Sequence, residues 1–209
     1  MPKLFKYTIA LLIIACVFTS SQAQRFRGSL VLGGNFSQIT GDSMAGFNKV
    51  GLLGGAMVIA PISKKSSFET GILFSQKGSR SKVDTSSSGI PRPFFKLTLN
   101  YIEIPLLYQY QYNDYIGLQI GPYVGLLNSA VYNDGNQDFD KTPNFYRFDY
   151  GLATGVQIAF TSKIALDIRA VNSVFNYLHY PLFTGLTANT PPTNYYNVVT
   201  SFGLRYTLN

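Results

Sequence analysis

Apolar and polar side chains alternate with a period of two along most of the chain after residue 23. The clearest run lies near the C-terminus. Its bulky face carries Val198, Thr200, Phe202, Leu204, Tyr206 and Leu208. The opposite face is small or polar, with Val199, Ser201, Gly203, Arg205 and Thr207. Because successive side chains of a strand point to opposite sides, this alternation predicts a β-strand with two different surfaces.

Similar alternation recurs along the chain, and no segment after residue 23 shows a sustained pattern of helical period. Together with the turn signals between the runs, it predicts strands over residues 26–38, 50–60, 67–79, 96–110, 114–129, 146–160, 164–176 and 196–208. Strands of soluble proteins average about 5 to 6 residues, whereas membrane-spanning strands need about 9 to 11. The lengths therefore favour an antiparallel membrane barrel, and an even strand number is usual for one.

The polarity of the two faces separates a membrane barrel from a soluble one. The interior of an eight-stranded barrel is just wide enough to be filled by side chains. A glycine-rich face with Asp149, Gln157, Asp167, Arg169 and Arg205 suits that interior. The large aliphatic face would exceed the few hundred Å² of apolar patch that soluble monomers usually expose. We therefore predict an all-β, eight-stranded, antiparallel, up-and-down transmembrane β-barrel, with a soluble lipocalin-like barrel as the alternative.

Short and long connections alternate along the chain. The short ones are residues 61–66, 111–113 and 161–163, and the long ones are 39–49, 80–95, 130–145 and 177–195. Membrane barrels place short turns on the periplasmic side and long loops outside. Aromatic residues gather near one turn and one long loop, as interfacial girdles do: Tyr108, Tyr110, Tyr112 and Tyr115, and Tyr146, Phe148 and Tyr150. The pattern predicts outward-facing long loops and periplasmic termini.

The first residues differ from the rest of the chain. Lys3 and Lys6 precede an apolar run from Ile9 to Phe18, and Ser21-Gln22-Ala23 forms a small-x-small cleavage signal. The run is about half the ~20 residues that a membrane-spanning helix needs. We predict a signal peptide over residues 1–23 and a barrel domain over residues 24–209.

The single cysteine, Cys16, lies inside the predicted signal peptide. Cleavage after Ala23 would leave a mature chain without a disulfide or a thiol nucleophile. The tetrad Ile13-Ile14-Ala15-Cys16 loosely resembles a lipoprotein signal, so lipidation of Cys16 stays open as the alternative.

The formal net charge of +7 comes from 17 basic and 10 acidic side chains. Removal of Lys3 and Lys6 with the signal peptide leaves 15 basic side chains and a net charge of +5. The positive residues are scattered, with Lys64-Lys65 the only adjacent pair after residue 23, and nucleic-acid binding needs a clustered basic face. We expect no nucleic-acid partner, and we expect contact with outer-membrane lipids and lipopolysaccharide.

Few residues suggest catalysis or metal binding. His179 is the only histidine, so a multi-histidine metal site is excluded, and no motif ties a serine or carboxylate to it. The acidic loop with Asp134, Asp138 and Asp140 lacks the spacing of an EF-hand. The segment from Gly41 to Gly46 lacks the Gly-x-Ser-x-Gly pattern of a nucleophile elbow. We predict a non-enzyme without cofactor or metal.

Charged residues on the predicted inward face form a more informative set. They are Glu69, Lys77, Glu103, Asp167, Arg169 and Arg205. Charges inside a membrane barrel must pair or stay hydrated. We expect a structural polar network that holds the barrel closed, and a thin polar conduit for small ions is the alternative.

Four segments resemble the PorT-like outer-membrane β-barrel family (porin family) common in Bacteroidetes. They are LVLGGNFSQITGD (Leu30 to Asp42), ETGILFSQKGSR (Glu69 to Arg80), LNYIEIPLLYQY (Leu99 to Tyr110) and GLQIGPYVGLLNSA (Gly117 to Ala130). The most specific parts are YIEIPLL and GPYVG, in that order and spacing. The resemblance covers nearly all of the mature chain and implies an eight-stranded outer-membrane barrel. The founding member is linked to protein secretion and gingipain maturation.

One departure concerns the C-terminus. Many barrels end on an aromatic residue that the barrel assembly machinery recognises, whereas this chain ends Tyr206-Thr207-Leu208-Asn209. We expect Tyr206 to serve that role from inside the end.

Taken together, these observations predict a non-enzymatic protein of the cell outer membrane. Its loops would act in envelope integrity, adhesion or contact with another envelope protein, and the resemblance adds a secretion-related role. The alternatives are a narrow porin-like channel and, less favoured, a lipid-modifying barrel enzyme that would depend on His179.

Overall fold

The computed structural model describes residues 26–40, 46–81, 96–175 and 196–208. Eight long strands form the wall: β1 (Arg27–Thr40), β2 (Lys49–Pro61), β3 (Ser66–Arg80), β4 (Lys96–Gln111), β5 (Ile116–Asn133), β7 (Phe148–Ala159), β8 (Ile164–Ser173) and β9 (Tyr196–Thr207). A short strand, β6 (Asp138–Asp140), and a 3-10 turn, η1 (Thr142–Asn144), lie between β5 and β7.

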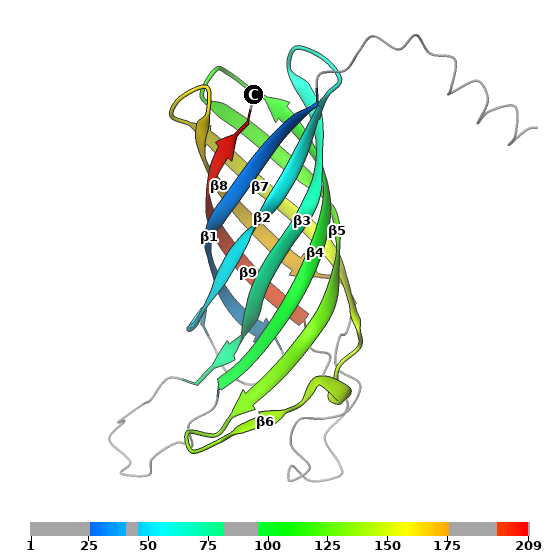
Figure 1. Ribbon diagram of the computed structural model, residues 1–209, viewed down its shortest axis with the longest axis vertical. Coiled ribbons are helices and arrows are strands. Elements are labelled where there is room, and N and C mark those ends of the chain that lie inside the picture. The colour runs from blue at the N-terminus through cyan, green and yellow to red at the C-terminus, as the bar shows by residue number, and fades with distance from the viewer. Residues whose placement is uncertain (1–25, 41–45, 82–95, 176–195, 209) are drawn as a thin grey trace, which may run out of the picture.

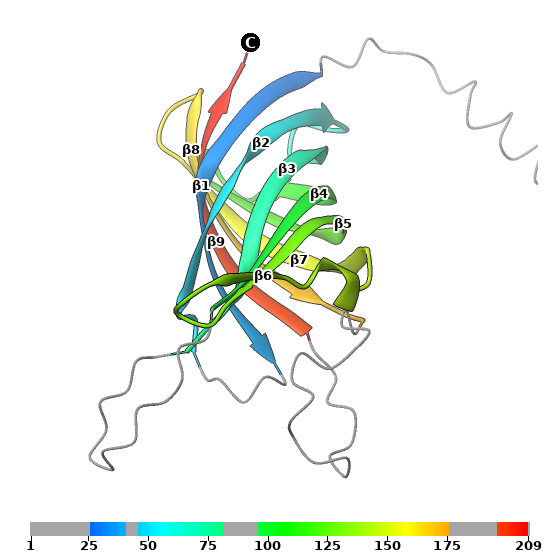
Figure 2. The ribbon, with the colours of Figure 1, turned by 60° about the horizontal axis from the view of Figure 1, so that its bottom comes forward.

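Each long strand pairs with its neighbour in the chain in the antiparallel sense, and β1 pairs with β9. The pairing of β4 with β5 completes the ring. Figure 2 looks partly along the axis and shows the strands arranged around one lumen. The predicted eight-stranded up-and-down barrel is therefore confirmed.

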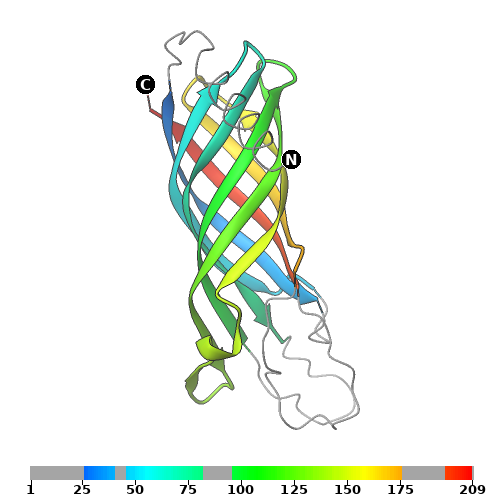
Figure 3. The same ribbon diagram turned by 90° about the vertical axis from the view of Figure 1, so that its right-hand side faces the viewer.

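The barrel has two different ends. The three short turns, the start of β1 and the end of β9 lie at one end, here called the turn end, and β6 lies beyond the other, here called the loop end (Figures 1 and 3). The predicted signal peptide with Cys16, the loop residues 41–45 and 82–95, and His179 lie outside the described residues.

The two faces of the wall have the predicted polarity. On β9, the Leu204 side chain points outward and is 55% exposed, whereas the neighbouring Arg205 points into the lumen and is 1% exposed. The outward residues of the other strands are also large and apolar, for example Ile120 and Leu152. Such a surface fits a lipid environment, so the alternative of a soluble barrel with inverted faces is wrong. Among the described residues, no helix is long and apolar enough to cross a membrane.

The connection between β5 and β7 is more ordered than the sequence predicted. Residues 130–145 were expected to form a loop, but β5 continues to Asn133 and β6 pairs back onto it. The turn between them is built by local hydrogen bonds, since the Asn133 side chain accepts from the backbone N–H of Gly135. Asp134 accepts from the backbone N–H groups of Asn136 and Gln137. Asn and Asp form such turns readily, and Gly135 supplies the positive φ of 100°.

Candidate functional site: the barrel interior and its turn-end cavity

Lys77 organises one group of charges in the half of the lumen nearer the loop end. Lys77 is fully buried, and its Nζ lies 2.5 Å from Glu103 Oε1 and 3.3 Å from Asp149 Oδ2. The same Nζ lies 5.1 Å from the centre of the Tyr101 ring and 4.7 Å from that of Tyr123. A cation between aromatic faces is attracted by their electron-rich surfaces. Strands β3, β4, β5 and β7 are thus joined through one ammonium group.

Two further hydrogen bonds reach the Asp149 oxygen that contacts Lys77, whereas the other oxygen, Oδ1, is buried without a donor. Asp149 Oδ2 accepts from Tyr123 Oη at 3.1 Å and from Asn197 Nδ2 at 3.3 Å. Removing one partner of a buried ion pair leaves an uncompensated charge and is strongly destabilising. We call Lys77, Glu103, Asp149, Tyr101 and Tyr123 the Lys77 group.

Apolar side chains close the lumen between the Lys77 group and the loop end. The cluster consists of Ile39, Leu97, Leu99, Tyr101, Leu127, Ala130 and Phe145, all buried. Phe145 follows η1, and the backbone N–H of Ala130 donates to the Thr142 side chain at 2.9 Å. The ordered connection therefore packs onto the end of the barrel and covers the Lys77 group on that side.

A second set of charges lies nearer the turn end. Arg205 Nη2 is 2.7 Å from Asp167 Oδ2, and Arg205 Nη1 is 2.9 Å from Glu69 Oε2. Arg169 Nη2 is 3.0 Å from the same Asp167 oxygen. Both guanidinium groups also approach the sulfur of Met57. We call these four charged residues the Arg205 group, and it links β3, β8 and β9.

Glutamine side chains extend the Arg205 group toward the turns. Gln157 Nε2 donates to Asp167 Oδ1 at 3.0 Å, and Gln109 Nε2 donates to Gln157 Oε1 at 2.8 Å. Gln119 Nε2 then donates to Gln109 Oε1 at 3.2 Å and to Glu69 Oε2 at 3.4 Å. The amides form a closed circuit with the carboxylates, in which Glu69 Oε1 and Gln119 Oε1 stay buried without a donor.

Apolar and neutral side chains separate the two charged groups. On β3, Leu73 lies between Glu69 and Lys77, and on β7, Ala153 lies between Asp149 and Gln157. A neutral chain of hydrogen bonds crosses the same region. Asn35 Nδ2 donates to Ser75 Oγ at 2.9 Å, and Ser201 Oγ donates to Asn35 Oδ1 at 2.8 Å. The described side chains thus fill the lumen in layers.

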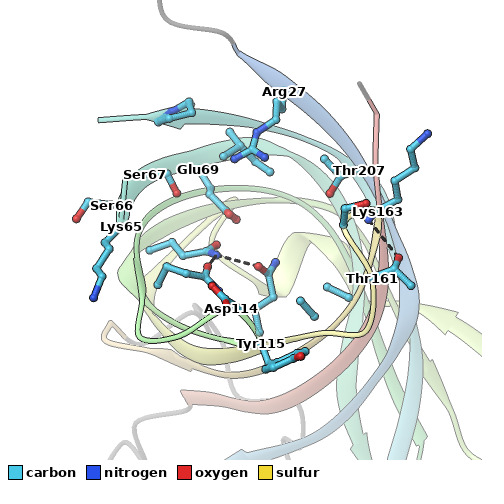
Figure 4. A pocket seen from close by; sticks show the side chains of 18 of the residues that line it. Arg27, Lys65, Ser66, Ser67, Glu69, Asp114, Tyr115, Thr161, Lys163 and Thr207 are labelled. Atoms are coloured by element: carbon cyan, nitrogen blue, oxygen red, sulfur yellow. Dashed lines mark hydrogen bonds between the residues drawn. The ribbon is translucent and has the colours of Figure 1, made fainter. Parts of the chain in front are cut away.

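A cavity of about 470 Å³ opens at the turn end. Its deep part is lined by Glu69, which is labelled in Figure 4, and by the hydrogen-bonded Gln109 and Gln157. Exposed residues of the turns and of the strand ends surround its mouth. They include Arg27, Lys64, Lys65, Asp114 and Lys163.

All six charged residues singled out from the sequence are buried on the inward face. The structure brings Lys77 and Glu103 together in one group, and Glu69, Asp167, Arg169 and Arg205 in the other. Alternation placed Asp149 on the inward face, but the predicted charge network omitted it. Its hydrogen-bond donors Tyr123 and Asn197, and Tyr101, whose ring contacts Lys77, were also missed. The alternation of the sequence predicts that these side chains point inward. Their contacts could not be predicted, because they join strands that are far apart in the chain.

The acidic residues of the outer connection do not form a metal site. Among the described residues, no three metal-ligating side chains come together. Hydrogen bonds from the backbone N–H groups of Gln137 and Asn136 lower the pKa of Asp134. The side chain and backbone of Thr142 lower the pKa of Asp140. The carboxylates therefore serve as turn and loop acceptors.

Three solved structures are similar to this chain. The Yersinia pestis attachment invasion locus protein Ail has a TM-score of 0.48 at 14% identity, covering 87% of this chain and 98% of its own. The Neisserial surface protein NspA has 0.49 at 15%, covering 87% and 96%. Pseudomonas aeruginosa OprG has 0.38 at 12%, covering 88% and 94%.

No curated protein matches the chain significantly. A family model does match, over residues 20–179, which is most of the chain, and that model describes the outer membrane protein beta-barrel domain. The alternating faces and the closed ring of strands agree with that description. The chain therefore belongs to the outer membrane protein beta-barrel domain family and is a β-barrel protein of the cell outer membrane.

Proposed function

We propose that this protein is a closed, non-enzymatic barrel that acts through its outer loops, in envelope integrity, adhesion or contact with another envelope protein. The observation that carries the proposal is the filled lumen. Two groups of buried charges and the apolar cluster at the loop end leave the described interior packed across the membrane. A wall built in this way is a rigid support, and binding residues of rigid scaffolds usually lie on their loops.

The connection from β5 to β7 supports this proposal because it forms an ordered platform at the loop end. The Tyr132 and Phe139 rings stack at 5.9 Å, and Lys141 Nζ lies 5.9 Å from the Phe139 ring centre. Residues at the tip, such as Asn136 and Gln137, are exposed. A preordered loop loses less conformational entropy when it binds a partner.

Within the family, we propose a PorT-like protein whose partner is an envelope protein connected with secretion. The support is the sequence resemblance around YIEIPLL and GPYVG. In YIEIPLL, the side chains of Tyr101, Glu103 and Leu107 point into the lumen and are buried. This motif therefore maintains the wall, and partner choice belongs to the loops.

Two further partners follow from the outward face. The half-exposed rings of Tyr108 and Tyr110 suit the lipid interface near the turn end. Outer-membrane lipid and lipopolysaccharide then surround the apolar belt. Tyr206 points outward on the last strand, where the barrel assembly machinery can reach it.

The proposal is tested by complementation of a deletion strain. Residues 134–139 are replaced by a Gly-Ser segment of equal length, and the strain is scored for sensitivity to detergent and for assembly of envelope partners. We expect the wild-type chain to restore resistance and the replaced chain to fail, although it still shows heat-modifiable migration on a gel. A replacement of Ile62 by glutamine, in an exposed turn at the opposite end and outside the cavity lining, is the control. Full restoration by the loop-replaced chain would contradict a role for this platform.

A further inference from the structure

We propose that the cavity at the turn end is a binding site for a soluble, carboxylate-bearing sugar–peptide, the chemistry of the cell-wall glycan strand. This site is independent of the outer-loop function, since it lies at the opposite end of the barrel. The periplasm is the compartment that the turn end of a bacterial barrel faces. In that compartment the cell wall is an abundant polymer that carries carboxylates together with hydroxyl and amide groups.

The size and shape of the cavity suit part of such a ligand. Its volume of about 470 Å³ falls within the roughly 300–1,000 Å³ of ligand pockets. The lining combines short hydroxyl side chains at the mouth with amides below, including Ser67, Thr207, Gln109 and Gln157. Ser67 lies on the same face of β3 as Glu69 and near the mouth, as Figure 4 shows. Groups of this kind form hydrogen bonds with hydroxyl and amide groups of a ligand.

The charges around the mouth favour an anion. Four cationic residues surround it, namely Arg27, Lys64, Lys65 and Lys163, against the single carboxylate of Asp114. In the part of the chain that the structure describes, none of these four cations forms an ion pair. Clustered charge of one sign at the entrance of a cleft raises the local concentration of oppositely charged ligand.

The floor of the cavity favours a hydrogen-bond donor on the ligand, and not an anion. Glu69 lines it and is 1% exposed, and its Oε1 has no hydrogen-bond donor although its Oε2 contacts Arg205. The neighbouring Gln119 Oε1 is also buried without a donor. Buried acceptors without donors are costly. A ligand that places an N–H or O–H group at the floor and a carboxylate at the mouth satisfies both regions at once.

The site binds its ligand without passing it through the membrane. Beyond the floor lie the Arg205 group and then the apolar layer with Leu73 and Ala153. The cavity is therefore blind, and its ligand would tether the barrel to a periplasmic polymer.

The test uses the full-length mature protein folded into phosphatidylcholine nanodiscs. It is titrated with the purified disaccharide–tetrapeptide of the cell wall, and binding is followed by calorimetry. Two variants probe the two regions: Ser67→Phe fills the mouth without a change of charge, and Lys64→Gln with Lys65→Gln removes two rim charges. Matched controls are Thr70→Phe, which adds the same ring on the outward face of β3, and Lys141→Gln with Arg147→Gln at the loop end.

We expect saturable binding by the wild-type protein and a loss of at least tenfold in affinity for Ser67→Phe. The lysine pair should weaken binding roughly threefold to tenfold, the range set by exposed ion pairs, and both controls should bind like the wild type. Heat-modifiable migration shows that each variant is folded. Absence of saturable binding, or binding that survives Ser67→Phe, overturns the proposal.

A lipid arm distinguishes headgroup phosphates from a soluble ligand. Because the turn-end lysines also lie near the inner leaflet, the nanodiscs are prepared with added phosphatidylglycerol and the titration is repeated. We expect the sugar–peptide to bind with little change. If anionic lipid abolishes that binding while Ser67→Phe does not, the rim belongs to lipid and the cavity is not a ligand site.

Discussion

The two buried charge groups differ in how they are shielded from water. In the Lys77 group, one cation lies between two carboxylates and two tyrosine rings, and an apolar cluster covers it toward the loop end. In the Arg205 group, Arg205 contacts two carboxylates and Arg169 one of them, and Glu69 also lines the open cavity. One barrel thus contains an ionic centre covered by an apolar cluster and another that borders an open cavity.

This difference determines how much stability the barrel loses when one partner of a buried ion pair is removed. A charge left alone in a dry interior keeps its full desolvation penalty, whereas a charge near an open cavity is partly rehydrated. The Lys77 group should therefore tolerate substitution less well than the Arg205 group. The same contrast explains why a ligand site is expected at the turn end alone.

The largest effect is expected for Lys77→Met. It leaves Glu103 and Asp149 buried without their shared cation, which should destabilise the folded barrel by about 3–5 kcal/mol. Urea unfolding in detergent micelles, followed by gel migration and circular dichroism, measures the change. These two probes suit the chain because it has no tryptophan for indole fluorescence.

A charge-neutral variant provides the control for that prediction. Lys77→Met combined with Glu103→Gln and Asp149→Asn removes the uncompensated charges and should recover most of the lost stability. If the combined variant is no more stable than Lys77→Met alone, packing around Lys77, and not its charge, would carry the effect.

A smaller effect is expected for Asp167→Asn. The substitution removes the carboxylate that both Arg205 and Arg169 contact, but Glu69 remains beside Arg205 and the cavity gives access to water. We expect a loss of about 1–3 kcal/mol in the same unfolding assay. A loss as large as that of Lys77→Met would remove the distinction between the covered group and the group beside the cavity.

The smallest effect concerns acid and the outer connection. The pKa values of Asp134 and Asp140 are lowered by hydrogen bonds in the folded loop. Their contribution to loop order is fully present above the ordinary pKa of an aspartate and is lost as the pH falls through the lower pKa values of the folded loop. We expect the protection factors of the Gln137 and Thr142 amides to fall below that range while the barrel strands stay protected. Hydrogen exchange measured by NMR checks this. Protection factors of these two amides that are the same at low pH as at neutral pH would contradict it.

Much of the wall follows from the sequence because alternation of period two determines which side chains point inward. The run from Val198 to Leu208 is an example, since its polar member Arg205 faces the lumen as predicted. The strand bounds agree within a few residues for the same reason. Most of β5 was predicted, but the pairing of its last residues with β6 was not.

The contacts of the interior could not be read from the sequence. Lys77 meets Asp149, which is 72 residues further along the chain, only because ring closure and strand tilt bring β3 and β7 across the lumen from each other. Alternation predicts whether a side chain points into the lumen but not where it lies along the barrel axis. It therefore does not assign Lys77 and Glu69 to different charge groups. The turn-end cavity depends on the same three-dimensional arrangement, since its lining comes from turns and strand ends that are distant in sequence.

The most direct test of a closed barrel is its conductance. The refolded protein is inserted into planar lipid bilayers in concentrated salt, and single-channel current is recorded at voltages of both signs. A lumen filled by the Lys77 group, the Arg205 group and the apolar cluster between β1, β4 and β5 predicts no stable current steps. Reproducible steps that disappear with Ser67→Phe and persist with Thr70→Phe would show ion flow through the lumen and contradict the account.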